Sequence, residues 1–440
     1  MRDSFLFNAL ATSFLAGEPN VDQLVSRATR ALGAPWPWLR PLARRYAGAF
    51  AGKTQPRRKE VARFLSRDAG FARARAKYSH QITVAEWLVA PSQMQPAAAV
   101  SALDLPTIVS VRELADWLRV DVTDLEWLAD LKALAYKNGE PKLRHYRYQI
   151  LAKRSGGLRL VEAPKAHLKG LQRQILKRIL EKVPPHPAVH GFVKGRSIKT
   201  FVQPHVGKQV VLRMDLHDFF PSFAGARVQA FFRTLGYPER VADLLGGLCT
   251  NATPRDVWSG FPMAMDQLRD ARALHSRPHL PQGAPTSPLL ANSCAYRVDC
   301  RLTGLAKSAG ADYTRYADDL AFSGDAELES RIGRFSVHVV AILMEEGFRV
   351  NHHKTRVMRR GVRQHLAGLV ANKHPNIARP DYDRLKAILT NCVRFGPDGQ
   401  NREGIARFRE HLEGRVAFAA AVNPARGNKL RAILGRIRWT

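Results

Sequence analysis

The spacing of apolar and polar residues divides the chain into helical ends and a mixed middle. From about Tyr146, short apolar runs punctuated by glycine alternate with helical segments, which predicts an α+β region. Residues 210–216 form a β-branched, apolar run that ends with Asp215 and Leu216. Residues 314–323 predict two strands with a turn around Asp318 and Asp319. Three carboxylates are therefore expected at the ends of sheet strands.

Past Arg379 the apolar residues recur at helical spacing. They form two stripes: Tyr382, Leu385, Ile388, Leu389 and Cys392, and then Ile405, Phe408, Leu412 and Val416. Arg384, Lys386 and Arg394 lie outside the first stripe, which gives its helix a basic solvent face. The C-terminal region is therefore predicted to be helical and cationic.

Two capping boxes predict a pair of short helices within residues 106–139. Ser110 with Glu113, and Thr123 with Glu126, match the pattern in which a hydroxyl and a carboxylate cap the first helical turn. The second helix offers mostly acids to solvent, so a packing pair is favoured over a DNA-reading helix-turn-helix. Residues 1–105 form a basic, helical N-terminal extension, and residues 95–106 resemble a linker.

The sign of the net charge points to a polyanionic partner. The chain has 69 Lys and Arg against 38 Asp and Glu, a net charge of +31 and a pI near 10.7. Self-repulsion makes such an excess costly unless a polyanion neutralises it. Nucleic acid is the favoured partner, and an anionic membrane surface is the alternative.

Aromatic residues are interleaved with cations between Arg40 and Lys77. This stretch has twelve Lys or Arg and two acids, and the aromatic residues in and beside it are Trp36, Trp38, Tyr46, Phe50, Phe64 and Phe71. Cations beside stacking faces suit a nucleic-acid surface. Helices with basic solvent faces and aromatic core faces would give the same pattern, so both interpretations stay open.

Cysteine usage and hydropathy predict a cytoplasmic protein. The four cysteines have no zinc-ligand spacing and are interpreted as buried thiols from a reducing compartment. No apolar run approaches the ~20 residues of a membrane span, and polar residues interrupt the first 15 residues where a signal peptide would lie. We therefore expect no membrane partner.

Asp215, Asp318 and Asp319 are the candidate catalytic residues. A like-charge cluster in an apolar strand setting destabilises the fold unless a cation neutralises it. Two Mg²⁺ ions about 3.5–4 Å apart can activate a hydroxyl and neutralise a leaving pyrophosphate, and Mn²⁺ is a candidate substitute. The competing interpretation of the adjacent pair is an ordinary surface turn, and only its sequence context favours chemistry.

That context resembles a known family. Tyr316-Ala317-Asp318-Asp319, followed by Leu-Ala-Phe-Ser, is similar to the palm motif of bacterial retron-type reverse transcriptases. Further blocks resembling that family occur in its order: residues 153–159 for the fingers hairpin, 190–198 for the block after it, 215–220 for the first palm aspartate, 280–288 for the loop before the templating helix, and 347–355 after the active-site hairpin. The resemblance runs from about Val111 to the C-terminus.

The resemblance implies a right-hand polymerase with fingers at 140–205, palm at 206–370 and a helical thumb at 371–440. It implies that Asp215, Asp318 and Asp319 are catalytic, with Leu216 as a further metal ligand. The other implied site residues are Lys153, Arg159, Phe220, Gln282, Gly283 and Lys354 for the nucleotide, and Tyr316, Arg384, Lys386 and Arg394 for nucleic acid. In this family an aromatic at Phe220 excludes a 2′-hydroxyl, so deoxynucleotides are selected.

The same resemblance implies the partners. They are a structured noncoding RNA that serves as template and primer, the growing RNA–DNA duplex, and dNTPs. Priming from an internal guanosine 2′-hydroxyl would link the single-stranded DNA product to its RNA (msDNA). Too few residues follow Arg379 for an RNase H fold, so host RNase H is expected to act in trans. Antiphage defence with an effector or toxin protein is the implied role.

Two segments depart from the retron pattern. Where the family usually has Asn-Ala-x-x-His, residues 201–205 keep only His205, and where it has Val-Thr-Gly, residues 366–368 are Leu-Ala-Gly. These departures leave a group II intron-like or abortive-infection reverse transcriptase as alternatives. RNA polymerase activity is opposed by Phe220. From another class, a non-catalytic RNA-binding scaffold is the rival hypothesis.

Overall fold

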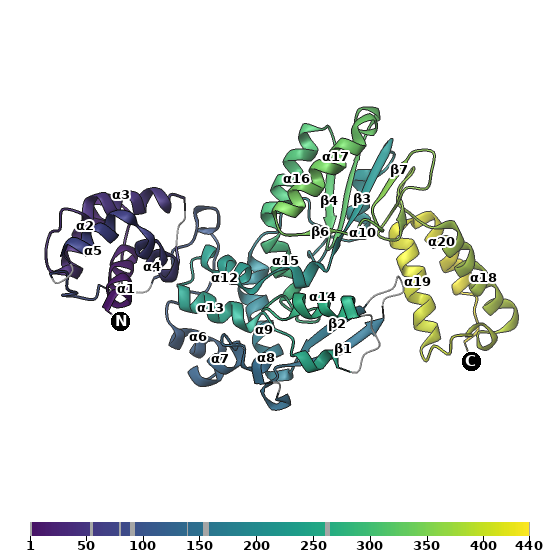
Figure 1. Cartoon of the computed structure of the whole chain (residues 1–440). Coiled ribbons are helices and arrows are strands. Elements are labelled where there is room, and N and C mark those ends of the chain that lie inside the picture. The colour runs from purple at the N-terminus through teal and green to yellow at the C-terminus, as the bar shows by residue number, and fades with distance from the viewer. Residues whose placement is uncertain are drawn as a thin grey trace.

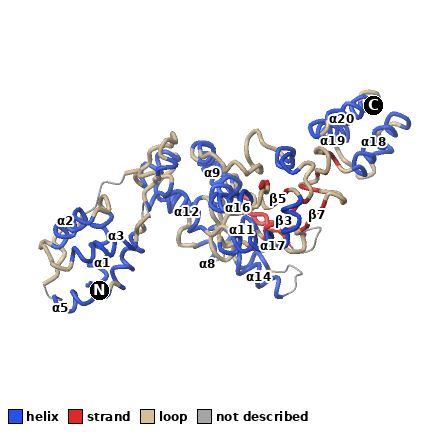
Figure 2. The backbone as a smooth tube through the Cα atoms, turned by 90° about the horizontal axis from the view of Figure 1, so that it is seen from above, coloured by secondary structure: helices blue, strands red, loops and turns tan. Residues whose placement is uncertain are grey.

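The molecule is elongated, with a mixed helix and sheet body between two helical ends. The computed structural model describes residues 2–52, 56–78, 81–88, 93–138, 140–152, 158–259 and 265–439. Five helices lie at the N-terminal end, and three lie at the opposite, C-terminal end (Figure 1). Figure 2 gives the same order from above. Helices and sheets together confirm the predicted α+β class.

The N-terminal helices enclose a hydrophobic core of their own. They are α1 (Arg2–Leu15), α2 (Val21–Leu32), α3 (Leu39–Ala49), α4 (Arg58–Arg67) and α5 (Ala69–Tyr78). Tyr46 and Phe71 are fully buried there, and Trp36, Trp38, Phe50 and Phe64 pack against the same cluster. The aromatic spacing is therefore that of core faces, which favours the second of the two interpretations.

Polar contacts join these helices to the body. Arg57 Nη2 donates to Gln229 Oε1 (2.8 Å) and lies 3.3 Å from Asp243 Oδ1. Residues 93–106 connect the two parts, as the linker prediction required, but they lie along the body. Gln95 N–H donates to the Gly236 carbonyl (2.9 Å), and a Cβ at Gly236 (φ 103°) would stand 2.6 Å from the nitrogen of Pro96. Only glycine permits this approach.

A second cluster of helices builds the largest core. Its members include α6 (Val111–Leu118), α7 (Val122–Ala129), α9 (Ala166–Arg178), α12 (Gly225–Thr234) and α13 (Glu239–Leu248), and the short helix α8 (Leu134–Asn138) follows α7. Leu114 and Leu118 of α6 and Leu125 and Leu128 of α7 are buried in it, which confirms the packing pair. The start of the second helix was misplaced by two residues, because Asp121 rather than Thr123 precedes α7.

An antiparallel sheet crosses the middle of the body. Its strands are β3 (Val210–His217), β4 (Asp312–Tyr316), β5 (Asp319–Gly324), β6 (Arg349–Val350) and β7 (Arg356–Arg359). The order is β4-β5-β3-β6, and β7 also pairs with β3. Helices α16 (Tyr296–Ser308) and α17 (Ala326–Glu345) lie over the sheet (Figure 1). The two predicted strands and their turn are confirmed.

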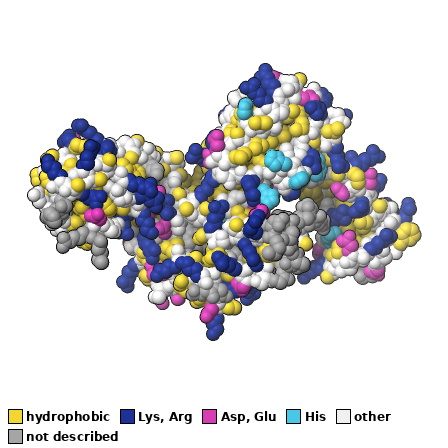
Figure 3. Space-filling view, viewed as in Figure 1, with side chains coloured by type: hydrophobic (Ala, Val, Ile, Leu, Met, Phe, Trp, Pro, Cys, Tyr) yellow, Lys and Arg dark blue, Asp and Glu magenta, His cyan; other side chains and the backbone are white. Residues whose placement is uncertain are grey.

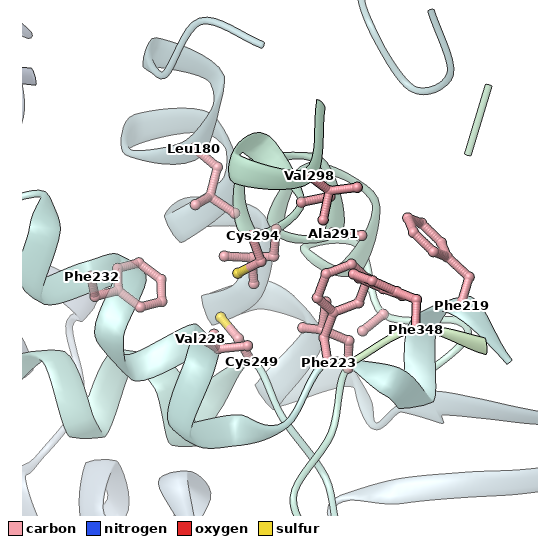
Figure 4. Packing of buried hydrophobic residues seen from close by; sticks show 14 of the residues in the cluster. Leu180, Phe219, Phe223, Val228, Phe232, Cys249, Ala291, Cys294, Val298 and Phe348 are labelled. Atoms are coloured by element: carbon pink, nitrogen blue, oxygen red, sulfur yellow. The ribbon is translucent and has the colours of Figure 1, made fainter. Parts of the chain in front are cut away.

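Smaller elements complete the body. The helices are α10 (Ile198–Val202), α11 (Phe219–Ser222), α14 (Met265–His275) and α15 (Ser287–Cys294). Strands β1 (Tyr146–Ala152) and β2 (Leu158–Pro164) form a hairpin, and β8 (His365–Leu366), β9 (Leu369–Val370) and β10 (Asn376–Ile377) form a small sheet. Figure 4 shows Phe219, Phe223 and Phe348 packed together in the main core.

The C-terminal helices are α18 (Arg379–Phe395), α19 (Phe408–Val422) and α20 (Pro424–Leu434). The apolar stripe of α18 is confirmed, because Leu385, Leu389 and Cys392 are buried. Ile405 precedes α19, so the second stripe begins one turn later than expected. Three cysteines are buried, and the prediction was wrong for Cys300, which is exposed on α16. Within the described ranges, every helix is too short or too polar to traverse a bilayer.

A buried ion pair lies beneath the edge strand of the central sheet. Arg315 of β4 is the largest fully buried side chain, and its Nε and Nη2 donate to Asp299 Oδ1 (2.8 Å) and Oδ2 (2.7 Å) of α16. Tyr313 O–H also donates to Asp299 Oδ1 (2.8 Å). Burial opposes the arginine charge, but the Asp299 carboxylate outweighs it and raises the pKa of Arg315.

We predict that Arg315→Met lowers the free energy of unfolding by about 3–5 kcal/mol, because it leaves the Asp299 charge buried without a partner. Urea unfolding measures this. Arg315→Met combined with Asp299→Leu should recover most of the loss, since no charge then stays buried. Arg331→Met is the control, because Arg331 is exposed and its pair with Glu327 (3.1 Å) should contribute less than about 1 kcal/mol. Equal losses in the single and double variants would contradict the electrostatic explanation.

Candidate active site

Strand pairing brings the three predicted catalytic carboxylates together. Asp215 lies directly opposite Asp319 in the antiparallel register of β3 and β5. Asp318 is in the turn between β4 and β5, and its carbonyl accepts a hydrogen bond from the N–H of Leu216 (2.9 Å). Asp215 is buried, while Asp318 and Asp319 are half-buried. The structure thus gathers residues that are a hundred positions apart in the chain at one end of the sheet.

The turn that carries Asp318 has a strained backbone held by buried contacts. Ala317 adopts a left-handed conformation (φ 55°), which costs a non-glycine residue about 1–2 kcal/mol. Its carbonyl accepts from Arg315 Nη1 (3.1 Å). On the other side lies Gly191, where a Cβ would stand 2.5 Å from the Ala317 nitrogen. Asn292 of α15 donates to the Gly191 carbonyl (2.9 Å), so the main core holds the turn in place.

Burial and neighbouring carboxylates raise the proton affinity of Asp318 and Asp319. Burial, followed by the charges of Asp215 and Asp319, raises the pKa of Asp318 to about 6. Burial also raises the pKa of Asp319, although Arg213 Nη2 donates to its Oδ1 (2.7 Å) and opposes the shift. Lys354 Nζ lies 3.1 Å from both oxygens of Asp215. Two side-chain cations therefore partly neutralise a cluster that is electrostatically unfavourable by itself.

The residues predicted to contact the nucleotide lie on several elements. Arg159 is exposed on β2, and Gln282 and Gly283 lie in the loop before α15. The N–H of Glu162 donates to the Gln282 carbonyl (2.8 Å), so the loop is fixed to the β1–β2 hairpin. Lys153 lies outside the described residues. The hairpin and the loop are thus one unit, which the sequence did not indicate.

Phe220 and its neighbour Phe219 differ in burial. Phe219 is buried in the core, while Phe220 is half-buried. The Phe220 ring centroid lies 6.1 Å from that of Phe192, an exposed aromatic with φ 61°. Phe192 belongs to the block at 190–198, but its proximity to Phe220 could not be read from the sequence.

The C-terminal cations are exposed, and Tyr316 is half-buried beside the carboxylates. Arg384, Lys386 and Arg394 all lie on the solvent face of α18. Tyr316 ends β4, and its ring lies 5.8 Å from that of Phe201. Lys and Arg are spread over the face of the molecule in Figure 3, with few acids among them.

A charged network that sequence analysis missed fixes the hairpin to the loop. Glu162 Oε2 and His279 Nε2 are 2.8 Å apart, and both side chains are fully buried. Thr253 and Asn251 donate to Glu162 Oε1 (2.7 and 2.8 Å). His279 Nδ1 faces the Arg277 carbonyl (2.8 Å). Because both ring nitrogens face acceptors, the doubly protonated imidazolium is the form that satisfies them.

The pKa directions agree with this geometry. Burial alone would raise the pKa of Glu162, but the charge of His279 and its hydrogen bond outweigh burial and lower it. Burial alone would lower the pKa of His279, and the Glu162 carboxylate reverses that direction and raises it. The only sequence signal for this pair was a glutamate in an otherwise apolar strand and a histidine just before the loop.

The two segments that depart from the retron pattern have defined places in the fold, and the retained His205 has a structural role. His205 is fully buried and its ring nitrogens lie 2.7 Å from Ser323 Oγ of β5 and Thr314 Oγ1 of β4. Burial lowers the pKa of His205 to about 3, so a neutral ring links the two strands that carry the turn. Leu366 ends β8, and Ala367 (φ 44°) and Gly368 (φ 87°) form the turn to β9.

Comparison with known proteins identifies the family. The reverse transcriptase (RNA-dependent DNA polymerase) family matches residues 151–368. The retron Mx162 reverse transcriptase of Myxococcus xanthus is 37% identical over 350 residues, which cover 76% of this chain and 68% of that protein. The chain belongs to the retron reverse transcriptases. This family is one of RNA-directed DNA polymerases, so the recognition of a polymerase from the carboxylate motif was correct.

Other retron reverse transcriptases are similar as well. The Mx65 enzyme of Myxococcus xanthus is 42% identical over 289 residues, covering 66% of this chain and 64% of that protein. The Ec86 enzyme of Escherichia coli is 28% identical over 340 residues, covering 76% of this chain and 91% of that protein. Membership of the retron family replaces the intron-like and abortive-infection alternatives that the two departures had left open.

Membership also implies a dependence on divalent metal ions. Carboxylate oxygens are the ligands that hard divalent cations prefer, and the raised pKa of Asp318 marks a cluster that a cation would relieve. As the described side chains are arranged, however, no three acidic, histidine or cysteine residues are grouped to hold an ion. Asp215 is bound to Lys354 and Asp319 to Arg213. The carboxylate oxygens are therefore of the type that a divalent cation prefers. The ion pairs of Asp215 with Lys354 and of Asp319 with Arg213 would rearrange when a metal ion binds.

The Glu162–His279 pair predicts a pH dependence of stability for this retron reverse transcriptase. Glu162 stabilises the fold at pH values above its ordinary pKa of 4.5, and this stabilisation is lost as the pH falls through its lowered pKa. His279 stabilises the fold at pH values below its ordinary pKa of 6.5, and this stabilisation is lost as the pH rises through its raised pKa. The pair is therefore fully stabilising between pH 4.5 and 6.5.

Urea unfolding of the wild type and of His279→Gln, measured across pH, tests this. The difference in unfolding free energy between the two proteins should be largest within that window and should shrink on the alkaline side. His275→Gln is the control. The His275 ring faces the Ala271 carbonyl instead of a Glu162 oxygen, and burial lowers the pKa of His275. A difference that does not change with pH would contradict a charged pair.

Proposed function

We propose that this retron reverse transcriptase copies a structured noncoding RNA into single-stranded DNA by nucleotidyl transfer at Asp215, Asp318 and Asp319. The observation that carries the proposal is the meeting of these three carboxylates at one end of β3 and β5. The charge of Asp318 gives the fold no benefit, because burial and the charges of Asp215 and Asp319 oppose its ionisation. Such a costly arrangement is typical of catalytic sites.

In this proposal the carboxylates hold divalent cations, with Mg²⁺ as the physiological ion and Mn²⁺ as a substitute. Asp215, Asp318, Asp319 and the backbone carbonyl of Leu216 are the proposed ligands. When bound, two such ions supply activation of the 3′-hydroxyl and charge neutralisation of the leaving pyrophosphate. The chain itself orients the carboxylates through the buried contacts of Arg315 and Gly191, and Lys354 adds positive charge beside Asp215.

The nucleotide-binding surface is proposed to combine the hairpin and the loop before α15. Lys153 and Arg159 would contact the triphosphate, and Gln282 and Gly283 would lie along the new base pair. The Glu162–His279 pair supports this proposal, because it fixes β2 relative to that loop. Preorganised positions of this kind lower the entropic cost of bringing reactants together.

The polymerase divisions follow in the same proposal. Residues 140–205 act as fingers, 206–370 as palm and 371–440 as thumb, with the helical pair at 106–139 and the extension at 1–105 before them. Tyr316 at the site and Arg384, Lys386 and Arg394 on α18 would contact the nucleic acid. Exposed cations on one helix face suit the phosphates and 2′-hydroxyls of an RNA–DNA duplex.

The biological setting is proposed from the family. Priming from an internal guanosine 2′-hydroxyl of the template RNA would give an RNA-linked DNA, and host RNase H would remove copied RNA in trans. Antiphage defence with an effector or toxin protein is the proposed role. The rival hypothesis of a non-catalytic RNA-binding scaffold is disfavoured, because a scaffold has no use for an electrostatically strained carboxylate cluster.

We predict opposite effects of Asp318→Asn on activity and stability. The variant should lose extension of a DNA primer on an RNA template by at least about a thousandfold, because a metal ligand and its charge are lost. Its free energy of unfolding should also rise by about 1–3 kcal/mol at neutral pH, because ionised Asp318 is unfavourable in the folded state. Urea unfolding measures this gain. Asp312→Asn on the same strand pair is the control for activity. A wild-type protein that fails to extend primers with either metal ion would favour the scaffold hypothesis.

We predict that Phe220→Ala lowers the discrimination between deoxynucleotides and ribonucleotides. Removing the ring opens space beside the sugar, so the ratio of kcat/KM for dNTP over the matched NTP should fall by about tenfold or more. Single-nucleotide incorporation on a primed RNA template measures this ratio. Phe192→Ala is the matched control, because it removes the adjacent exposed ring and leaves Phe220 in place. Unchanged selectivity in Phe220→Ala would exclude the proposed role.

A further inference from the structure

A basic hollow lies on the surface between α6 and α9. It has a volume of about 390 Å³ and is lined by Trp117, Arg119, Arg173, Gln174, Lys177 and Arg178. We call these residues the α6–α9 hollow. None of them belongs to the carboxylate cluster, the β1–β2 hairpin or the loop before α15. Helix α6 lies toward the N-terminal end of the body, and α18–α20 lie at the other end (Figure 1).

Buried contacts build the hollow. Leu171 and Ile175 fix the inner face of α9 in the main core, and Leu114 and Leu118 do the same for α6. Gln174 Nε2 donates to the Trp117 carbonyl, which ties the middle of α9 to the last turn of α6. Both walls are therefore fixed to a rigid core.

The positive charge of the hollow has no partner within the described chain. Arg119, Arg173, Lys177 and Arg178 are all exposed, and none has a carboxylate within 4 Å among the described residues. A nearby cation of the body differs, because Lys182 lies 2.7 Å from Asp104. Four unpaired cations around one hollow repel one another, and that repulsion is relieved by a bound polyanion.

Helix stability explains only part of this cluster. Lys177 and Arg178 lie in the last turn of α9, where cations are favoured by the helix dipole. Arg173 lies mid-helix, and Arg119 follows a different helix. Arg119 also has φ 61°, a left-handed conformation usually given to glycine at a helix C-terminus. A cation is thus present at a position where local structure favours glycine.

We propose that the α6–α9 hollow binds a single-stranded segment of RNA, at a second site distinct from the proposed polymerase cleft. Arginine guanidinium groups bind phosphates through paired hydrogen bonds, and the half-buried indole of Trp117 gives an unstacked base an apolar surface. Bases of a duplex are already stacked, so a single strand fits better. The inference rests on the proposed function, because that function supplies the RNA partner.

The segment bound here is RNA that is not being copied at that moment. In the proposed function the template is also the primer and stays joined to the growing DNA, so a second contact outside the cleft would hold it while the duplex moves. RNA is favoured over an acidic protein, because the cations surround an aromatic side chain, the combination that binds phosphate and base together.

The test uses the full chain and polyuridylate as the single-stranded probe. Arg173→Gln with Lys177→Gln should weaken binding and reduce the slope of log affinity against log salt by about 1.4, the value for two phosphate contacts on a single strand. Lys307→Gln with Arg334→Gln is the charge-matched control, because both residues are exposed on the helices over the sheet. Its slope should stay at the wild-type value.

Two further measurements separate the possible outcomes. Photocrosslinking of thiouridine-substituted polyuridylate should label the peptide containing Trp117 in wild type, and the double variant should lose that label. Extension of a short primed RNA template should be unchanged in the double variant, whereas Asp318→Asn should lose extension and keep the full salt slope. Failure of the polymerase proposal is thus distinguishable from failure of this one.

An unchanged slope in a folded double variant, checked by circular dichroism, would overturn the inference. Equal losses in the double variant and in the charge-matched control would also overturn it, because binding would then reflect net charge alone. Loss of polyglutamate binding with RNA binding intact would assign the hollow to an acidic protein partner instead.

Discussion

The antiparallel pairing of β3 with β5 is the constraint on which the site depends. Its register sets Asp215 opposite Asp319, and the turn before β5 adds Asp318. A shift of one residue would move Asp215 to the other face of the sheet. The register is held by buried side chains on both strands, including Val211, Leu212 and Phe322. Burial of apolar side chains therefore holds together carboxylates whose like charges repel one another.

Two buried charge pairs around this sheet join elements that are separate in the chain. Arg315 and Asp299 link β4 to α16 and reach the strained turn at Ala317. Glu162 and His279 link β2 to the segment before α15. A buried pair gives little net stability compared with apolar residues of the same size, but it is satisfied in one geometry only. Both pairs lie where the proposed chemistry requires fixed positions.

Sequence alone was sufficient for the parts that local pattern controls. The run at 210–216 became β3 (Val210–His217), and the turn at Asp318 was found because strand spacing and turn position are both local properties. The contacts that hold the site in place could not be predicted from the sequence. Glu162 and His279 are 117 positions apart, and nothing in either neighbourhood indicates the other. The α6–α9 hollow needs two helices whose relative position is set by the whole core. Aromatic spacing near the N-terminus was ambiguous, because core faces and stacking faces use the same residues.

The attachment of the N-terminal helices has a consequence for how that unit behaves. The unit has a core of its own, and its contacts with α12 and α13 include the polar interactions of Arg57, which salt screens. Residues 93–106 nevertheless remain hydrogen-bonded to the body. A released unit would therefore stay tethered at a high effective concentration and would rebind rapidly.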